Sequence, residues 1–302
     1  MAHVERKAVL FVGLGAMGSL MCPHLAASEE YDVLVSDMDT SRAAEIARRI
    51  GARAITAEEI SSSLLGLDIV IFMLPDSTVV EDVVTNGLFD TLSPGSLIID
   101  MGSSRPASTV ALAESAASRG ILYVDAPVSG GTRRATDGTL TIMVGATDEG
   151  FGAAQPLLAH LGSEVAHVGA PGAGHALKAL NNLLSAIGLA AASEVLAIGT
   201  RFGLKTSTML ETLNTATGRN HATEVKFIPH VLTHQFDSGF SLKLMVKDLK
   251  LAVDLADHTG TPIPIAKTAV NQWMEAEQSL PPGADHTHFA AYVEKKADVR
   301  FE

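Results

Sequence analysis

The stretch "VLFVGLGAMGSLM" (residues 9–21) places three glycines within six positions, directly after an apolar run. Gly13, Gly15 and Gly18 form the pattern G-x-G-x-x-G, and the run before them predicts a strand that leads into a helix. The first glycine of such a pattern permits a tight turn, the second lets backbone approach a pyrophosphate, and the third lets helix and strand pack closely. The helix N-terminus offers free N–H groups and a positive dipole to the phosphates. The stretch therefore predicts a dinucleotide-binding turn made of Gly13, Leu14, Gly15, Ala16, Met17 and Gly18.

Asp37 ends the next apolar run, at the place where an acidic residue would bind the ribose hydroxyls of NAD. A carboxylate there repels the additional phosphate of NADP. Arg42 lies within reach of such a phosphate if Asp37 turns away, although it is also typical of a solvated charge in the first turn of a helix. The sequence therefore favours NAD, with NADP as the alternative.

Short apolar runs alternate with helix-like stretches through the first half of the chain. The runs are rich in β-branched residues and mostly lack alternation, which is typical of strands buried on both faces. They span residues 8–13, 32–37, 68–74, 96–100, 121–126 and 140–145. Helical stretches such as 41–50 and 106–120 lie between them. This order predicts an α/β fold with a doubly wound, Rossmann-type parallel sheet over residues 1–170.

The pattern changes near "VGAPGAG" (168–174), after which strand signals fade. Residues 175–203 read as one long helix with apolar residues on more than one face, and 241–260 and 264–280 read as further helices. A helix that is apolar nearly all round is buried, so we expect the long helix at a domain or subunit boundary. The predicted second domain is all-helical and covers residues 171–302.

Composition limits the class of partner. The formal net charge of −12 argues against nucleic acid or an anionic membrane as the main partner, but it permits small anionic substrates. A single cysteine, Cys22, excludes an intrachain disulfide and leads us to expect a reducing, cytoplasmic compartment. No apolar run approaches the roughly 20 residues that cross a bilayer, so we expect no membrane partner.

Four segments, spread from residue 9 to residue 254, resemble signatures of the β-hydroxyacid dehydrogenase family, which includes 3-hydroxyisobutyrate dehydrogenase and tartronate semialdehyde reductase. They are "GLGAMGSLM", "DAPVSGGTRRATDGTLTIMVG" (125–145), "GAGHALKALNN" (172–182) and "KDLKLAVD" (247–254). Their order and spacing make the resemblance specific. It implies hydride transfer between NAD and a short-chain 3-hydroxy acid similar to 3-hydroxyisobutyrate, glycerate, threonate or serine.

Lys178 and Asn182 lie four residues apart on the long predicted helix and therefore share a face, with Asn181 beside them. A lone helical lysine is usually a solvated charge, but this one lies in an apolar stretch, and burial lowers the pKa of a lysine. The resemblance implies that Lys178 is the general acid/base. Asn182 can hold the substrate hydroxyl against it by a hydrogen bond.

The resemblance also implies roles for residues elsewhere in the chain. Ser129, Gly130 and Gly131 suit a substrate carboxylate, and Lys247 would lie close to nicotinamide and substrate, with Asp248 orienting it or capping its helix. Leu74 and Pro75 would line the adenosine side, and Ser103 would approach the nicotinamide ribose. Arg219 and Asn220 are candidates for the distal end of the substrate.

Two other classes of function remain as alternatives. One is a reductase of imines or other carbonyl analogues on the same fold, and the other is a non-enzymatic dinucleotide-binding module. The presence of Lys178 and Asn182 argues against both. No step of the expected chemistry needs a metal. We expect a homodimer or homotetramer that packs through the helical domains, because so apolar a long helix needs cover.

Overall fold

The computed structural model describes residues 6–60 and 66–302. The chain divides into two compact units, Met1–Lys178 and Ala179–Glu302. Their boundary falls inside helix α9 (Ala173–Phe202), whereas the boundary expected from sequence, between 170 and 171, lies just before that helix. Each unit has its own hydrophobic core.

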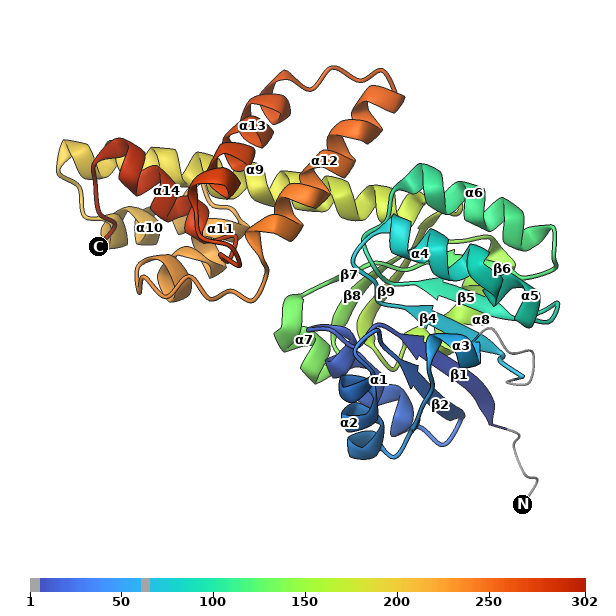
Figure 1. Cartoon of the computed structure of the whole chain (residues 1–302). Helices are drawn as coiled ribbons and strands as arrows, with labels where there is room; N and C mark the ends of the chain where they lie inside the picture. Colours follow the sequence, from blue (N-terminus) through green and yellow to red (C-terminus); the bar gives the residue numbers. More distant parts are fainter. Residues whose placement is uncertain (1–5, 61–65) are drawn as a thin grey trace. The chain divides into compact units, whose positions relative to one another are not determined.

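Unit 1 is built on a sheet with the strand order β3-β2-β1-β4-β5-β6-β8-β7, in which β9 also pairs with β8 (Figure 1). The strands are β1 (Lys7–Val12), β2 (Tyr31–Ser36), β3 (Arg53–Ala54), β4 (Ile69–Phe72), β5 (Leu97–Asp100), β6 (Leu122–Asp125), β7 (Val128–Ser129), β8 (Leu140–Gly145) and β9 (Gly162–Gly169). The ladder from β3 to β6 is parallel throughout. The six strands expected from sequence are confirmed, and a Rossmann-type fold results.

The far edge of the sheet adds two strands that the sequence did not indicate. Strand β8 runs antiparallel to β6 and β7, and β9 then pairs parallel with β8. The expected Rossmann-type sheet is confirmed, but β7 and β9 were not foreseen because they carry no apolar run that marks them as strands. The residues of β9 are mostly exposed or half-buried, which suits an edge strand.

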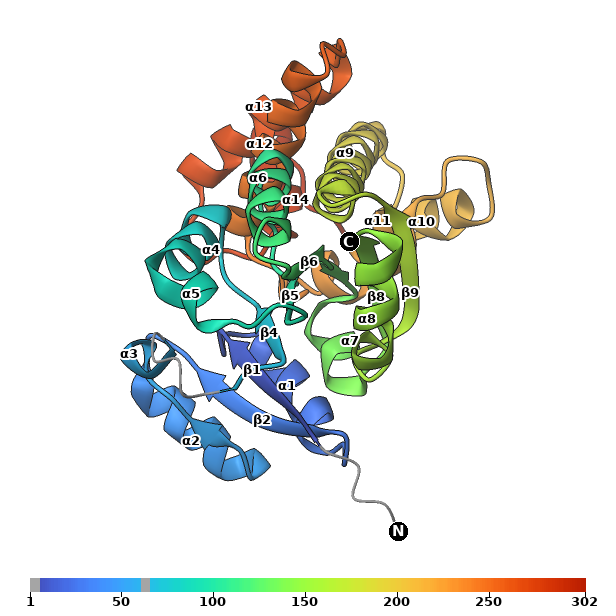
Figure 2. The ribbon, with the colours of Figure 1, turned by 90° about the vertical axis from the view of Figure 1, so that its right-hand side faces the viewer.

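Helices cover both faces of the sheet (Figure 2). Successive side chains of a strand point to opposite faces, so Val9 and Phe11 belong to one core layer, while Leu10 and Val12 belong to the other. The first layer packs against α1 (Gly18–Ala26), α2 (Thr40–Ile50), α7 (Gly131–Asp137) and α8 (Asp148–Leu158). The second packs against α3 (Ala57–Ile60), α4 (Ser77–Val83), α5 (Phe89–Thr91) and α6 (Pro106–Ala117). Burial on both faces explains the continuous apolar runs.

Unit 2 is helical, as expected. It contains the remainder of α9 with α10 (Thr206–Asn214), α11 (His221–Val225), α12 (Leu242–His258), α13 (Pro264–Ser279) and α14 (His288–Ala297). Its core surrounds Trp273, which is fully buried, stacks on Phe289 at 4.3 Å, and donates its indole N–H to the carbonyl of Ala186 at 3.3 Å. That hydrogen bond ties α13 to α9.

Helix α9 departs from one expectation. By length and mean hydropathy (1.7) it is apolar enough to cross a bilayer, so the prediction that no segment has this property was wrong among the described residues. The uninterrupted runs counted in the sequence are short, but the average over a longer window is high. Half of that window is buried within the protein, as in the core helix of a globular protein.

Candidate active site

The glycine turn between β1 and α1 has the form that a phosphate cradle requires. Gly13 has a φ of +97°, and a Cβ there would lie 2.4 Å from the carbonyl oxygen of Met73. A Cβ at Gly18 would lie 2.0 Å from the carbonyl oxygen of Gly13. A Cβ at Gly15 would meet nothing within 4 Å. The fold itself therefore requires the first and third glycines, whereas the space at Gly15 is left for a ligand, which fits the pyrophosphate of a dinucleotide.

Asp37 follows β2 and closes on the same turn. Its Oδ2 accepts a hydrogen bond from the backbone N–H of Leu14 at 2.7 Å, and its Oδ1 accepts one from the N–H of Asp39 at 2.9 Å. The guanidinium of Arg42 lies 3.5 Å from Oδ1, and its side chain is about half exposed. The carboxylate is thus held beside the glycine turn, in the place where the sequence predicts contact with ribose hydroxyls. The guanidinium of Arg42 forms an ion pair with the Asp37 carboxylate and does not take its place beside the glycine turn.

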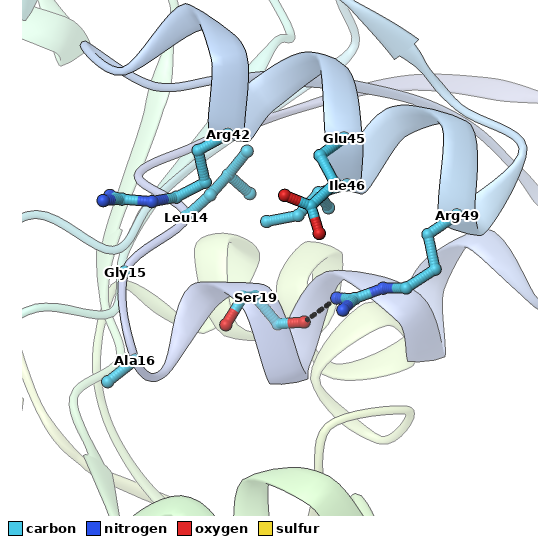
Figure 3. A pocket seen from close by; sticks show the side chains of 8 residues that line it. All are labelled: Leu14, Gly15, Ala16, Ser19, Arg42, Glu45, Ile46 and Arg49. Carbon is cyan, nitrogen blue, oxygen red and sulfur yellow. Dashed lines mark hydrogen bonds between the residues drawn. The ribbon is translucent and has the colours of Figure 1, made fainter.

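A hollow of about 360 Å³ lies beside the cradle (Figure 3). The glycine turn and α1 line one side, and α2 lines the other with alternating charges. The lining residues are Leu14, Gly15, Ala16, Ser19, Arg42, Glu45, Ile46 and Arg49. The guanidinium of Arg49 donates to the carbonyl of Ser19 at 3.1 Å, which fixes that end of the hollow.

The start of α9 is anchored by a buried carboxylate. Asp125, at the end of β6, is fully buried and accepts hydrogen bonds from the backbone N–H groups of Gly172 and His175 at 2.7 and 2.8 Å. The imidazole of His175 in turn lies 2.8 Å from the hydroxyl of Thr109 and 3.8 Å from Asp100. Burial raises the pKa of Asp125, while the backbone donors and His175 act in the opposite direction. The anchoring holds the first turn of α9, and Lys178 lies in the following turn.

Asn182 is held in one orientation by a buried carboxylate. Its Nδ2 donates to Oδ2 of Asp248 at 2.6 Å, and its Oδ1 accepts from Nδ2 of Asn181 at 3.1 Å. A carboxylate only accepts hydrogen bonds, so the amide nitrogen of Asn182 must face Asp248. Lys247 lies 3.5 Å from the other oxygen of Asp248. Three predicted residues, Asn181, Asn182 and Lys247, are therefore brought together around Asp248.

Lys178 lies one turn before Asn182 in the same continuous helix and is half-buried. Residues four apart on a helix share a face, so the ammonium and the amide project from one side of α9. In unit 1, Ser129 ends β7, and Gly130 and Gly131 follow at φ of +127° and +67°. A Cβ at Gly130 would clash with the side chain of Arg134, whereas Gly131 is open. Gly130 and Gly131 are both exposed, so this turn is open to a ligand on its surface.

Other predicted residues have different placements. Leu74 contacts the glycine turn, because its side chain is the third nearest neighbour of a Cβ at Gly13. Pro75 and Ser103 lie in the segments that follow β4 and β5. Arg219 is exposed between α10 and α11. Asn220 caps α11, since its Oδ1 accepts hydrogen bonds from the N–H groups of Ala222 and Thr223.

Sequence reasoning gave no role to the buried Asp125 and did not foresee the contact of Asp248 with Asn182. Asp125 and Asp248 were visible only as members of signature segments, and Asp248 was expected to orient Lys247 or cap a helix. In the structure α12 is capped by Ser241, and Asp248 lies inside the helix against Asn182. A buried acidic residue in an otherwise apolar helical face was the available signal.

Comparison with known proteins identifies the family of this chain. Residues 8–169 match the model of the NAD-binding domain of 6-phosphogluconate dehydrogenase, and residues 172–293 match that of the NAD-binding region of NADP-dependent 3-hydroxyisobutyrate dehydrogenase. The chain belongs to the β-hydroxyacid dehydrogenase family. The family explains why a dinucleotide cradle and a helix with the Lys178–Asn182 pair occur in one chain.

Three relatives illustrate the family. The chain is 40% identical to 2-(hydroxymethyl)glutarate dehydrogenase of Eubacterium barkeri, with 86% of this chain and 85% of that protein covered. It is 34% identical to NAD-dependent L-serine dehydrogenase of Pseudomonas aeruginosa, with coverage of 88% and 90%. The solved structure of Mycobacterium tuberculosis 3-hydroxyisobutyrate dehydrogenase with L-serine is 28% identical, has a TM-score of 0.86, and is covered over 99% of its length by 96% of this chain. As a member of this family, the present chain is an NAD-dependent oxidoreductase that acts on hydroxy acids.

Proposed function

We propose that the protein oxidises the hydroxyl group of a short 3-hydroxy acid, with Lys178 as the general acid/base. The main support is the orientation of the Asn182 amide, whose Nδ2 donates a hydrogen bond to Oδ2 of Asp248 at 2.6 Å. This amide lies on the face of α9 that also bears Lys178. Relatives that act on 2-(hydroxymethyl)glutarate and L-serine support this substrate class, because both compounds carry a hydroxyl on the carbon next to the one that bears the carboxylate.

In this proposal the proton of the substrate hydroxyl passes to Nζ of Lys178, which must therefore be neutral when oxidation begins. Asn182 keeps one amide hydrogen for Asp248 and directs the second toward the substrate hydroxyl, which holds that group beside Lys178. In the reverse direction Lys178 returns the proton to the carbonyl oxygen.

The remaining residues bind and orient. Ser129, Gly130 and Gly131 bind the carboxylate next to the reacting carbon, and Lys247 with Asn181 completes the polar surroundings. Arg219, which is exposed, is retained as a weaker candidate for the outer part of the substrate. NAD, held by the glycine turn, Asp37, Leu74, Pro75 and Ser103, supplies the hydride acceptor. NADP is the alternative cofactor, and Arg42 is the residue that would serve it.

The test is reduction of NAD and NADP with 3-hydroxyisobutyrate, glycerate, threonate, serine and 3-hydroxypropionate. We expect turnover with at least one acid and a loss of about 100- to 10,000-fold in kcat for Lys178→Ala, with NAD affinity retained. Lys243→Ala is the matched control, because Lys243 is an exposed lysine of α12. Cofactor binding without turnover on any acid would contradict the proposal and favour an imine reductase.

We also propose a homodimer or homotetramer formed through α9. Large apolar side chains at 177, 184, 195, 198 and 202 are 40% to 84% exposed, and their spacing places them along one side of the helix. That side differs from the one that bears Lys178 and Asn182 by roughly 120° or more around the helix axis, so we expect a second copy there to leave the reacting face open. Light scattering on the wild type and on Ile198→Asp tests it, with a persistent oligomer of the variant as the contradicting result.

We also propose that the protein is located in the cytoplasm. Its support is chemical: the one cysteine, Cys22, is buried and reduced, as in proteins of reducing compartments. Cell fractionation with an antibody against the chain is the direct measurement. Recovery outside the cytoplasm would contradict this part of the proposal alone.

A further inference from the structure

Lys226 is a buried cation without a carboxylate partner. It lies between α11 and a π-helical turn (Phe227–Val231), its side chain belongs to a residue only 8% exposed, and its Nζ donates to Oγ of Ser185 at 3.1 Å. Among residues 6–60 and 66–302, no carboxylate lies at ion-pair distance from this ammonium. Burial lowers the pKa of Lys226 to about 8, so the group is still largely charged at pH 7. A buried charge of this kind destabilises the fold unless an anion reaches it.

The described surroundings supply an anion only at longer range. Asp285 attracts Lys226, but its two oxygens accept hydrogen bonds from other donors, which are Ser238, Gly239, Phe240 and Thr287. His286 is buried as well, and burial together with the charge of Lys226 lowers its pKa to about 4. It is therefore neutral at pH 7, and within the described part of the chain its Nε2 has no hydrogen-bond partner. This part of unit 2 therefore holds a buried positive charge that Asp285 balances only from a distance and that no described carboxylate contacts directly.

The position of Ser185 connects this charge to the reacting face of α9. Ser185 follows Asn182 by three residues and Lys178 by seven, so the three side chains lie on one face of the helix. At 1.5 Å per residue, Ser185 lies about 5 Å beyond Asn182 and about 10 Å beyond Lys178 along the helix axis. A short aliphatic arm spans such a separation. Lys226 is thus placed to meet the far end of a substrate whose hydroxyl lies at Lys178.

We propose that Lys226, supported by Ser185, binds a second carboxylate of the substrate, and that the preferred substrates are 3-hydroxy acids with a carboxylate at each end. The inference rests on the proposed hydroxy-acid activity and adds a specificity-determining residue to it. It assigns the distal group to Lys226 rather than to the exposed Arg219. An ion pair between the substrate and Lys226 would also remove the cost of burying the ammonium alone.

The first experiment needs no variant. Steady-state rates with NAD are compared for 2-(hydroxymethyl)glutarate and for 2-(hydroxymethyl)pentanoate, in which a methyl group replaces the distal carboxylate. We expect kcat/KM to be higher for the dicarboxylate by about 10- to 100-fold, as for one charge-assisted contact, with most of the difference in KM. Equal values of kcat/KM would overturn the inference. Absence of turnover with either acid, and with the panel above, would instead contradict the proposed function.

Variants then assign the preference to the residue. In Lys226→Met the ratio of the two kcat/KM values should fall to near one, whereas Lys226→Arg should keep part of it and Ser185→Ala should reduce it a few-fold. Lys243→Met, at an exposed lysine, is the control that should leave the ratio unchanged. Thermal unfolding of each variant checks the fold. A ratio that persists in a folded Lys226→Met protein would refute the role of Lys226, and Ser185→Ala gives the same test if Lys226→Met does not fold.

Discussion

Alanine substitutions in the glycine turn should distinguish the glycines that the fold needs from the one that cofactor binding needs. A methyl group at Gly15 meets no atom within 4 Å, so Gly15→Ala should change the free energy of unfolding by no more than about 0.5 kcal/mol. The same methyl group occupies the space that a pyrophosphate needs. Loss of one charge-assisted contact from a backbone N–H to phosphate costs about 1.5–3 kcal/mol, which weakens NAD binding about 10- to 150-fold.

The other two glycines provide the contrast. Gly13→Ala would combine a left-handed φ with a Cβ 2.4 Å from the carbonyl oxygen of Met73, and Gly18→Ala would put a Cβ 2.0 Å from the carbonyl oxygen of Gly13. Both contacts involve backbone that cannot move cheaply, so each variant should lose about 2–4 kcal/mol of stability. Gly152→Ala in α8 is the matched control, because that Cβ is also open and a helical alanine gains about 0.5–1 kcal/mol over glycine.

The assays are calorimetric titration with NAD and urea unfolding of all four variants. The expected pattern is normal stability with weak NAD binding for Gly15→Ala alone. Wild-type NAD affinity in Gly15→Ala would refute the assignment of that space to the cofactor. A loss of stability in Gly15→Ala equal to that of Gly13→Ala would show that the turn is purely structural.

Three further predictions concern charge and burial. Asp37→Ser removes the carboxylate that Arg42 faces at 3.5 Å, so the ratio of kcat/KM for NADP over NAD should rise at least about tenfold, and an unchanged ratio would show that another group sets the preference. The pKa of Lys226 is lowered to about 8 in the fold, so between about pH 8 and 10.5 the unfolded chain binds more protons than the folded one. The free energy of unfolding should therefore rise with pH more steeply in the wild type than in Lys226→Met, by up to about 1.4 kcal/mol per pH unit. Equal slopes in urea titrations at several pH values would contradict this. Burial raises the pKa of Cys22 to about 12, so the native thiol should resist an aromatic disulfide reagent at pH 8 and react once the protein is unfolded in urea, whereas rapid native reaction would show an accessible thiolate.

The local features of the fold follow from local sequence. The strand that contains Val9 and Phe11 is recognisable because the helices on both faces of the sheet demand apolar residues at every position. The glycine turn is recognisable because its backbone conformation and close contacts exclude any side chain at Gly13 and Gly18. Strand β9 was missed because its exposed edge tolerates Glu164 and His167, which hide the strand pattern.

The polar contacts that position the site could not be predicted, since they join residues distant in the chain. The hydrogen bond from Asn182 to Asp248 joins residues 66 apart, and that from Lys226 to Ser185 joins residues 41 apart. No periodicity in a sequence carries such information. The family resemblance indicated Lys178 and Asn182, and their spacing predicted that they share a helix face, but the partner that fixes the amide of Asn182 required the tertiary structure.

Helix α9 shows why hydrophobic pattern alone was ambiguous. Apolar residues on more than one face suggested burial all round, yet Leu184, Ile198 and Phe202 are 70% to 84% exposed. One side of the helix is buried in the core of unit 2, a second bears Lys178, Asn182 and Ser185, and a third carries the exposed apolar side chains. Water contact along that third side is costly for a monomer, and the cost disappears when another copy covers it. The side that needs cover and the side that must stay accessible for the reaction are therefore different sides of the same helix, so that the proposed assembly would stabilise the helix without obstructing its chemistry.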